Sequence, residues 1–164
     1  MKTSALYLRT IIFGINDSLV STVGFLAGIS VAGVSREIIV LTGIVYALVE
    51  AFSMAMGDFL SEESAEEYMK KSDVSNRPSI VSAVLMFVSC VLASLVPLIP
   101  YILFASGIAL IVSICLSVLS LFIVGAISAS FSRLPMLWRG ARMALLGGAA
   151  IVMGVAIGTF MPIL

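Results

Sequence analysis

The stretch Ile38–Leu60, IIVLTGIVYALVEAFSMAMGDFL, is an apolar run long enough to cross a bilayer, and it carries a carboxylate, Glu50, near its middle. The preceding run, Thr10–Val34, has the same character and carries Asp17. An acidic side chain deep in a membrane costs about 2.5–3.5 kcal/mol unless a basic residue, a proton or a bound cation compensates it. All nine Lys and Arg residues lie at or beyond the ends of the apolar runs. The sequence therefore predicts a membrane protein that handles cations.

The composition is that of an integral membrane protein. Of the 164 residues, 61% are hydrophobic and 11% are charged, with a mean hydropathy of +1.22, whereas soluble domains carry about 25% charged residues. The formal net charge of zero offers no basic field for nucleic acid. The chain has no histidine and no recognisable set of catalytic residues, so we expect no enzymatic activity and no resident cofactor. Cys90 and Cys115 fall in apolar runs, which is typical of small packing residues.

Five apolar runs of about 20 residues predict an all-α, polytopic membrane protein with five transmembrane helices in a single domain, 1–164. The predicted spans are about 10–34, 38–60, 79–99, 101–127 and 143–163, with 61–78 as a short acidic cytoplasmic extension of the second helix. Pro97 and Pro100 predict the turn between the third and fourth spans. Short connections make neighbouring spans antiparallel.

The basic residues predict the orientation of these spans. Only Arg36 falls on one side of the membrane, and the other basic residues fall on the opposite side: Lys2, Arg9, Lys70, Lys71, Arg77, Arg133, Arg139 and Arg142. The positive-inside rule then places the N-terminus in the cytoplasm and the C-terminus outside. No organelle signal is visible, so the plasma membrane is the default expectation.

Two stripes of small residues offer close helix contacts. Gly24 and Gly28 form a GxxxG pair, and Ala150, Gly154 and Gly158 continue the pattern in the fifth span. The stripes suit either the seam of a symmetric homodimer or helix packing within one chain, and the sequence leaves both open.

The candidate metal ligands share one face of the first two spans. Counting residues from the predicted cytoplasmic ends places Asp17, Glu50 and Met54 around one point, and Asp58 continues the face of the second span. Carboxylate and thioether together favour Fe²⁺ or Mn²⁺ over Mg²⁺ or Ca²⁺. Met54 as ordinary apolar filling, and a protonated carboxyl bonded to a neighbour, are the alternatives.

An acidic run, SEESAEEYMKKS over Ser61–Ser72, follows the second span. Glu62 and Glu66 continue the row of Asp58 at helical spacing and complete the candidate metal ligands. The run either concentrates cations at the mouth of a pathway or is simply a solvated helix end. In the first span, Asn16-Asp17-Ser18 predicts a loosened helical turn that exposes carbonyl oxygens as ligands.

At these positions the chain resembles the vacuolar iron transporter family of Fe²⁺/Mn²⁺ carriers. The resemblance lies in GINDSLVST at Gly14–Thr22 and SMAMGDFLS at Ser53–Ser61, and then in Pro78, Ser82-Ala83, Val96–Pro100 and Arg139–Arg142. It implies five spans, a homodimer with the pathway at its two-fold interface, and proton-coupled export of divalent metal from the cytosol.

The resemblance also implies ligand positions. Asp17 matches the span-one acidic ligand of the family and Met54 matches its span-two thioether, whereas Tyr46 stands where the family has an acidic residue. Glu50, one turn later, is a possible substitute. The plant type carries a long Glu- and Met-rich domain between spans two and three, and this chain has only a short connection there.

The sequence thus predicts a proton-coupled exporter of Fe²⁺ or Mn²⁺ in which metal is substrate, protons are counter-ions and the lipid bilayer and a second copy are the partners. A passive cation channel and a non-transporting membrane scaffold subunit are the alternatives.

Overall fold

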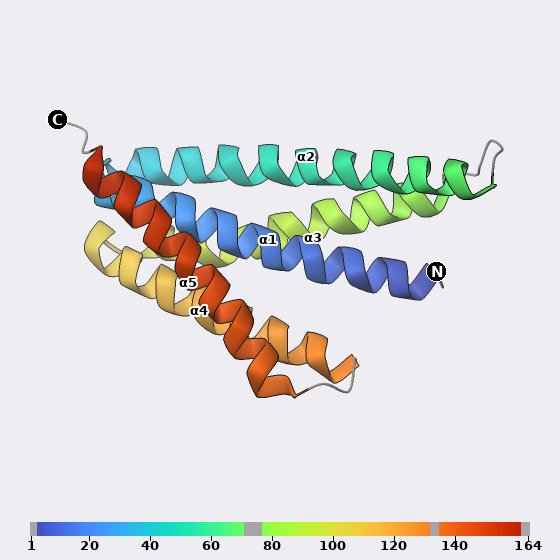
Figure 1. Cartoon of the computed structure of the whole chain (residues 1–164). Helices are drawn as coiled ribbons and strands as arrows, with labels where there is room; N and C mark the ends of the chain where they lie inside the picture. Colours follow the sequence, from blue (N-terminus) through green and yellow to red (C-terminus); the bar gives the residue numbers. More distant parts are fainter. Residues whose placement is uncertain (1–2, 71–76, 132–134, 162–164) are drawn as a thin grey trace.

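A computed structural model describes residues 3–70, 77–131 and 135–161 (Figure 1). These residues form five helices, each long and apolar enough to cross a membrane: α1 (Thr3–Val31), α2 (Arg36–Lys70), α3 (Arg77–Leu103), α4 (Ser106–Phe131) and α5 (Met136–Phe160). The described ranges hold no strand. The prediction of an all-α protein with five spanning helices is confirmed. The predicted sidedness of the termini stays a prediction, because no membrane is present.

Helix α1 is the central element of the bundle and packs against each of the other four helices. Helices α2 and α3 lie along one side of it, and α4 and α5 cross on the other (Figure 1). α1 ends at a turn where Gly33 adopts a positive φ of 86°, a conformation that glycine tolerates best. The start of α1 and the end of α5 lie at opposite ends of the bundle (Figure 1).

The predicted loosened turn at Asn16-Asp17-Ser18 is wrong. α1 continues without interruption from Thr3 to Val31. Ser18 is buried here, whereas Asn16 and Asp17 are partly exposed. α1 packs against each of the other four helices, which holds its backbone in the helix. The carbonyl groups here stay in the helical ladder, so they are not extra metal ligands.

Helix α2 has 35 residues, which at 1.5 Å per residue is about 50 Å and exceeds the hydrocarbon thickness of a bilayer. It continues beyond Leu60 through most of the acidic run and ends at Lys70. Of the predicted extension 61–78, residues 71–76 lie outside the described residues, and α3 begins at Arg77. Lys2, Lys71 and Arg133 also lie outside them, as do the side chains of residues 3, 4, 70, 106 and 131.

The predicted turn at Pro97 and Pro100 is wrong as well, because both prolines are fully buried inside α3. A proline removes the hydrogen bond to the carbonyl four residues before it, which here is that of Ala93 and that of Val96, yet α3 continues to Leu103. The hydroxyl of Ser113 on α4 donates to the carbonyl oxygen of Pro97 at 2.7 Å and joins the two helices at this level.

Arg36 helps to fix the end of α3 instead. Its Nε donates to the carbonyl oxygen of Tyr101 at 2.8 Å, and its Nη2 donates to that of Ile102. The last carbonyls of a helix have no partner within it, so a guanidinium there caps the helix. The turn into α4 accordingly follows Leu103 rather than the prolines.

The two stripes of small residues pack on each other within the chain. Of the two alternatives for them, a homodimer seam or helix packing within one chain, the structure shows the second. A Cβ added at Gly28 would lie 2.9 Å from the carbonyl oxygen of Gly154, and one at Gly24 would lie 3.1 Å from that of Ala150. At Gly154 and Gly158, an added Cβ would overlap the backbone of α1. The stripes are therefore occupied at the α1–α5 crossing and are not free to form a dimer seam.

Candidate functional site

Glu50 lies midway along α2 and faces α1. Its Oε1 accepts a hydrogen bond from the hydroxyl of Ser21 on α1, and the hydroxyl of Tyr46 donates to the same oxygen at 3.3 Å. Its other oxygen, Oε2, is buried and has no hydrogen-bond partner among the described residues. A buried carboxylate oxygen without a donor is costly, so this group requires a proton or a cation.

Tyr46 is held in place by an aromatic stack. Its ring lies parallel to that of Phe25 on α1, with centroids 4.5 Å apart and an interplanar angle of 9°. Tyr46 and Glu50 are i,i+4 on α2, so both side chains face the same way. Phe25, Tyr46 and Glu50 line a groove of about 670 Å³ on the outer side of α2, together with Ser53. The groove places a polar pair on an otherwise apolar surface.

Asp17 belongs to the same region of the structure. It lies on α1 one turn before Ser21, the residue whose hydroxyl donates to Glu50. Two carboxylates that repel each other in an apolar site favour binding of a proton or a cation, because either relieves the repulsion. The side chain of Asp17 is partly exposed, so it stays accessible from outside the chain.

Met54 and Asp58 lie in a separate cavity between α1, α2 and α3. The cavity measures about 320 Å³ and is also lined by Arg9, Ser53 and Met86. Asp58 is only 9% exposed, and its Oδ2 has no hydrogen-bond partner among the described residues. Ser53 lines both this cavity and the groove beside Glu50, so the two spaces adjoin at that residue.

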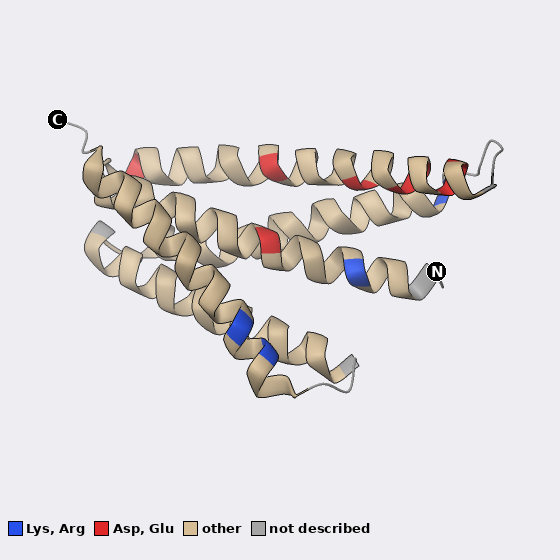
Figure 2. Ribbon diagram, viewed as in Figure 1, with Lys and Arg blue, Asp and Glu red and all other residues tan. Residues whose placement is uncertain are grey.

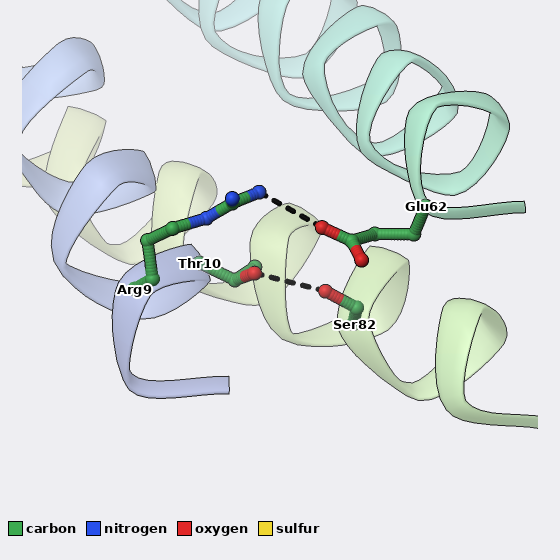
Figure 3. A network of polar contacts seen from close by, with 4 residues as sticks. All are labelled: Arg9, Thr10, Glu62 and Ser82. Carbon is green, nitrogen blue, oxygen red and sulfur yellow. Dashed lines mark hydrogen bonds and ion pairs between the residues drawn. The ribbon is translucent and has the colours of Figure 1, made fainter. Parts of the chain in front are cut away.

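Figure 3 shows two polar contacts made by Arg9 and Thr10, which both line this cavity. The guanidinium of Arg9 on α1 and the carboxylate of Glu62 on α2 form an ion pair of 2.8 Å. Beside it, the hydroxyls of Thr10 and Ser82 share a buried hydrogen bond of 2.9 Å between α1 and α3. Arg9 is 60% exposed and Glu62 15% exposed, so solvent screens the pair.

The acidic run is therefore only partly open to cations. Glu62 is paired with Arg9, and Glu66 is partly buried and engaged in an interaction of its own. Figure 2 shows that the acidic residues of α2 gather toward its C-terminal end, beside the start of α1. Among the described residues, no three His, Cys, Asp or Glu side chains converge on one point as a ready metal site.

The structure thus divides the six candidate ligands. Glu50 lines the groove, and Asp17 lies on α1 one turn before Ser21, which hydrogen-bonds to Glu50. Met54 and Asp58 line the cavity, and Glu62 is paired with Arg9. Glu66 lies further along α2.

Three residues of this region, Ser21, Arg9 and Met86, were not predicted from the sequence as part of the site. Ser21 follows Asp17 by one helical turn, and this spacing was the available signal. Arg9 lies at the start of span one and Glu62 just after the end of span two. In an antiparallel pair of helices these two ends lie side by side, so the pairing of Arg9 with Glu62 could have been expected. Met86 comes from α3 and carries no sequence signal that separates it from ordinary apolar residues.

Comparison with known proteins agrees with the architecture. A family model described as the VIT family matches residues 8–77 and 70–159, which is most of the chain. The two matched segments overlap at residues 70–77, between α2 and α3. No curated protein matches this chain.

Proposed function

This chain belongs to the vacuolar iron transporter family, a family of metal-ion transporters, and from that premise we propose that it exports Fe²⁺ or Mn²⁺ from the cytosol in exchange for protons. The supporting observation is Glu50, whose Oε2 is buried near the middle of α2 and has no hydrogen-bond partner in the described part of the chain. In a multi-pass membrane protein of a transporter family, a buried carboxylate of this kind can bind a transported cation or a proton.

Glu50 and Asp17 are the groups that alternate between metal and proton. An apolar environment disfavours a charged carboxylate, so each carboxyl holds a proton when no metal is near. A divalent cation that enters the site displaces the proton, and a proton that returns from the other side releases the cation. Ser21 and Tyr46 orient Oε1 and leave Oε2 for this exchange.

Met54 and Asp58 serve the same pathway from the adjoining cavity. A thioether beside oxygen ligands favours Fe²⁺ or Mn²⁺ over Mg²⁺ and Ca²⁺. Arg9 lines that cavity while paired to Glu62. The ion pair with Glu62 offsets the positive charge that Arg9 brings to the cavity.

The transporting unit is a homodimer. Within one chain the groove beside Glu50 is open on its outer side and is bordered by exposed apolar residues of α2, with Leu41 at 62% exposure and Val49 at 64%. A second copy placed on this face would enclose Glu50 and add a second set of ligands. That arrangement supplies the coordination that the described residues of one chain lack.

Flux measurements in proteoliposomes test the proposal. Wild-type protein should move Mn²⁺ against its gradient when protons flow the opposite way. Glu50→Gln keeps the size of the side chain and removes its charge, and it should lower the flux at least tenfold, about 1.4 kcal/mol. Glu37→Gln is the matched control, because Glu37 is an exposed carboxylate in the first turn of the same helix.

The same assay separates the alternatives. Mn²⁺ flux that ignores an imposed pH gradient would identify a passive cation channel. Absence of both Mn²⁺ binding and flux in folded wild-type protein would point to a non-transporting scaffold. Equal flux in Glu50→Gln and Glu37→Gln would remove Glu50 from the mechanism.

A further inference from the structure

A second polar cavity lies between α1 and the start of α5, on the side of the bundle away from α2. It measures about 540 Å³ and is lined by Asn16 of α1 and by Trp138, Arg139, Arg142, Met143 and Leu146 of α5. None of these residues belongs to the groove beside Glu50 or to the cavity beside Asp58. The cavity is therefore distinct from the proposed metal pathway.

The charge of this cleft is uncompensated. Arg139 and Arg142 are three residues apart on a helix, so both guanidiniums lie on one face. No acidic residue lines the cleft, and over the described part of the chain neither side chain has a hydrogen bond or ion pair. Two guanidiniums beside an amide match the oxygens of a phosphate group, which Arg binds with paired hydrogen bonds.

The apolar part of the cleft argues for an amphiphilic ligand rather than a free ion. Trp138 is 70% exposed and Leu146 is 60% exposed, and both line the cleft beside the arginines. Trp is enriched where a membrane meets water, with its ring beside lipid headgroups. Trp138 precedes the arginines on α5 and Leu146 follows them, so from Arg142 to Leu146 the surface passes from cationic to apolar, as a phospholipid passes from phosphate to acyl chain.

We propose that this cleft binds an anionic phospholipid. Arg139 and Arg142 hold the phosphate, Asn16 and Trp138 contact the headgroup, and Leu146 contacts the acyl chain. Basic clefts between transmembrane helices are a recurrent way to bind anionic headgroups. The proposal does not depend on transport of metal, because it rests on a different face of the bundle.

Native mass spectrometry of the full chain, released from micelles that contain equal amounts of phosphatidylglycerol and phosphatidylcholine, tests the proposal. Wild-type protein should retain phosphatidylglycerol in preference to phosphatidylcholine. Arg139→Gln and Arg142→Gln should each weaken that retention about fivefold, the effect of one cationic side chain near an anionic lipid surface. Arg77→Gln is the matched control, since Arg77 is an exposed arginine at the start of α3.

Two further measurements keep the result interpretable. Arg142→Lys retains the charge and should keep most of the lipid, and unchanged thermal unfolding of each variant shows that the fold is intact. Equal retention in the cleft variants and Arg77→Gln would overturn the proposal, as would equal retention of the two lipids. Complete displacement of phosphatidylglycerol by an equal concentration of inorganic phosphate would overturn the assignment to a lipid.

Discussion

The α1–α5 crossing gives the sharpest test of the structure. Gly154 faces the backbone of Gly24 so closely that an added Cβ would overlap its carbonyl group. Gly148 lies on the same helix, and a Cβ added there would meet nothing within 4 Å. Gly154→Ala and Gly148→Ala therefore make the same chemical change on the same helix in a closed and an open position.

The expected difference follows from the packing alone. Alanine improves helix propensity over glycine by about 1 kcal/mol, and this gain cancels between the two variants. What remains is the cost of forcing extra volume into a filled space, about 1–3 kcal/mol. The obstacle is backbone rather than a side chain that can rotate, so the two helices must separate. A cost of about 2 kcal/mol lowers Tm by about 4–8 °C in a chain of this size.

Thermal unfolding in detergent, followed by far-ultraviolet circular dichroism, measures this difference. Gly154→Ala should unfold at the lower temperature, and Gly148→Ala should match or exceed the wild type. If the two variants unfold at the same temperature, α1 and α5 do not cross at these glycines. The stripes would then be available to a second copy of the chain, contrary to their packing in this structure.

Three further predictions concern individual polar contacts. Ser82→Ala leaves the buried hydroxyl of Thr10 without its partner and should lower the free energy of unfolding in detergent by about 0.6–1.7 kcal/mol. If the Thr10→Val, Ser82→Ala double variant loses the full sum of the two single effects, the two hydroxyls do not share a hydrogen bond. Arg9→Gln and Glu62→Gln, measured singly and together, should show a coupling energy of about 0.2–1 kcal/mol that shrinks in high salt, and zero coupling at low salt would show that the ion pair is not formed. Tyr46→Phe should leave Tm unchanged, because the stacked ring remains, while lowering Mn²⁺ flux; an unaltered flux would exclude its hydroxyl from the site.

The local sequence pattern was sufficient to predict that the five helices exist, but not to predict where each one ends. Hydropathy predicted five spans because each helix had to bury its backbone polar groups in lipid. Pro97 and Pro100 misled the prediction, since both lie inside α3, which continues past them to Leu103 and is capped there by Arg36. Asn16-Asp17-Ser18 misled it in the same way, because neighbouring helices hold α1 straight.

The candidate site was likewise only partly predictable from the sequence. The position of Glu50 at mid-helix was evident from sequence, and so was the problem of its charge. Its donors were not, because Ser21 reaches it from another helix and Tyr46 is oriented by Phe25. Arg9 was assigned only to the membrane boundary, whereas in the folded chain it pairs with Glu62.

By itself, the sequence determined that this chain is an integral membrane protein with five spanning helices, and that it carries carboxylates where lipid cannot solvate them. These properties depend on composition and on the spacing of residues within single helices. The tertiary structure decided which faces meet: the small-residue stripes of α1 and α5 close on each other, and the carboxylates divide between a groove and a cavity. Helix rotation and crossing set those contacts, and they depend on the fit of all five helices together rather than on any one stretch of chain.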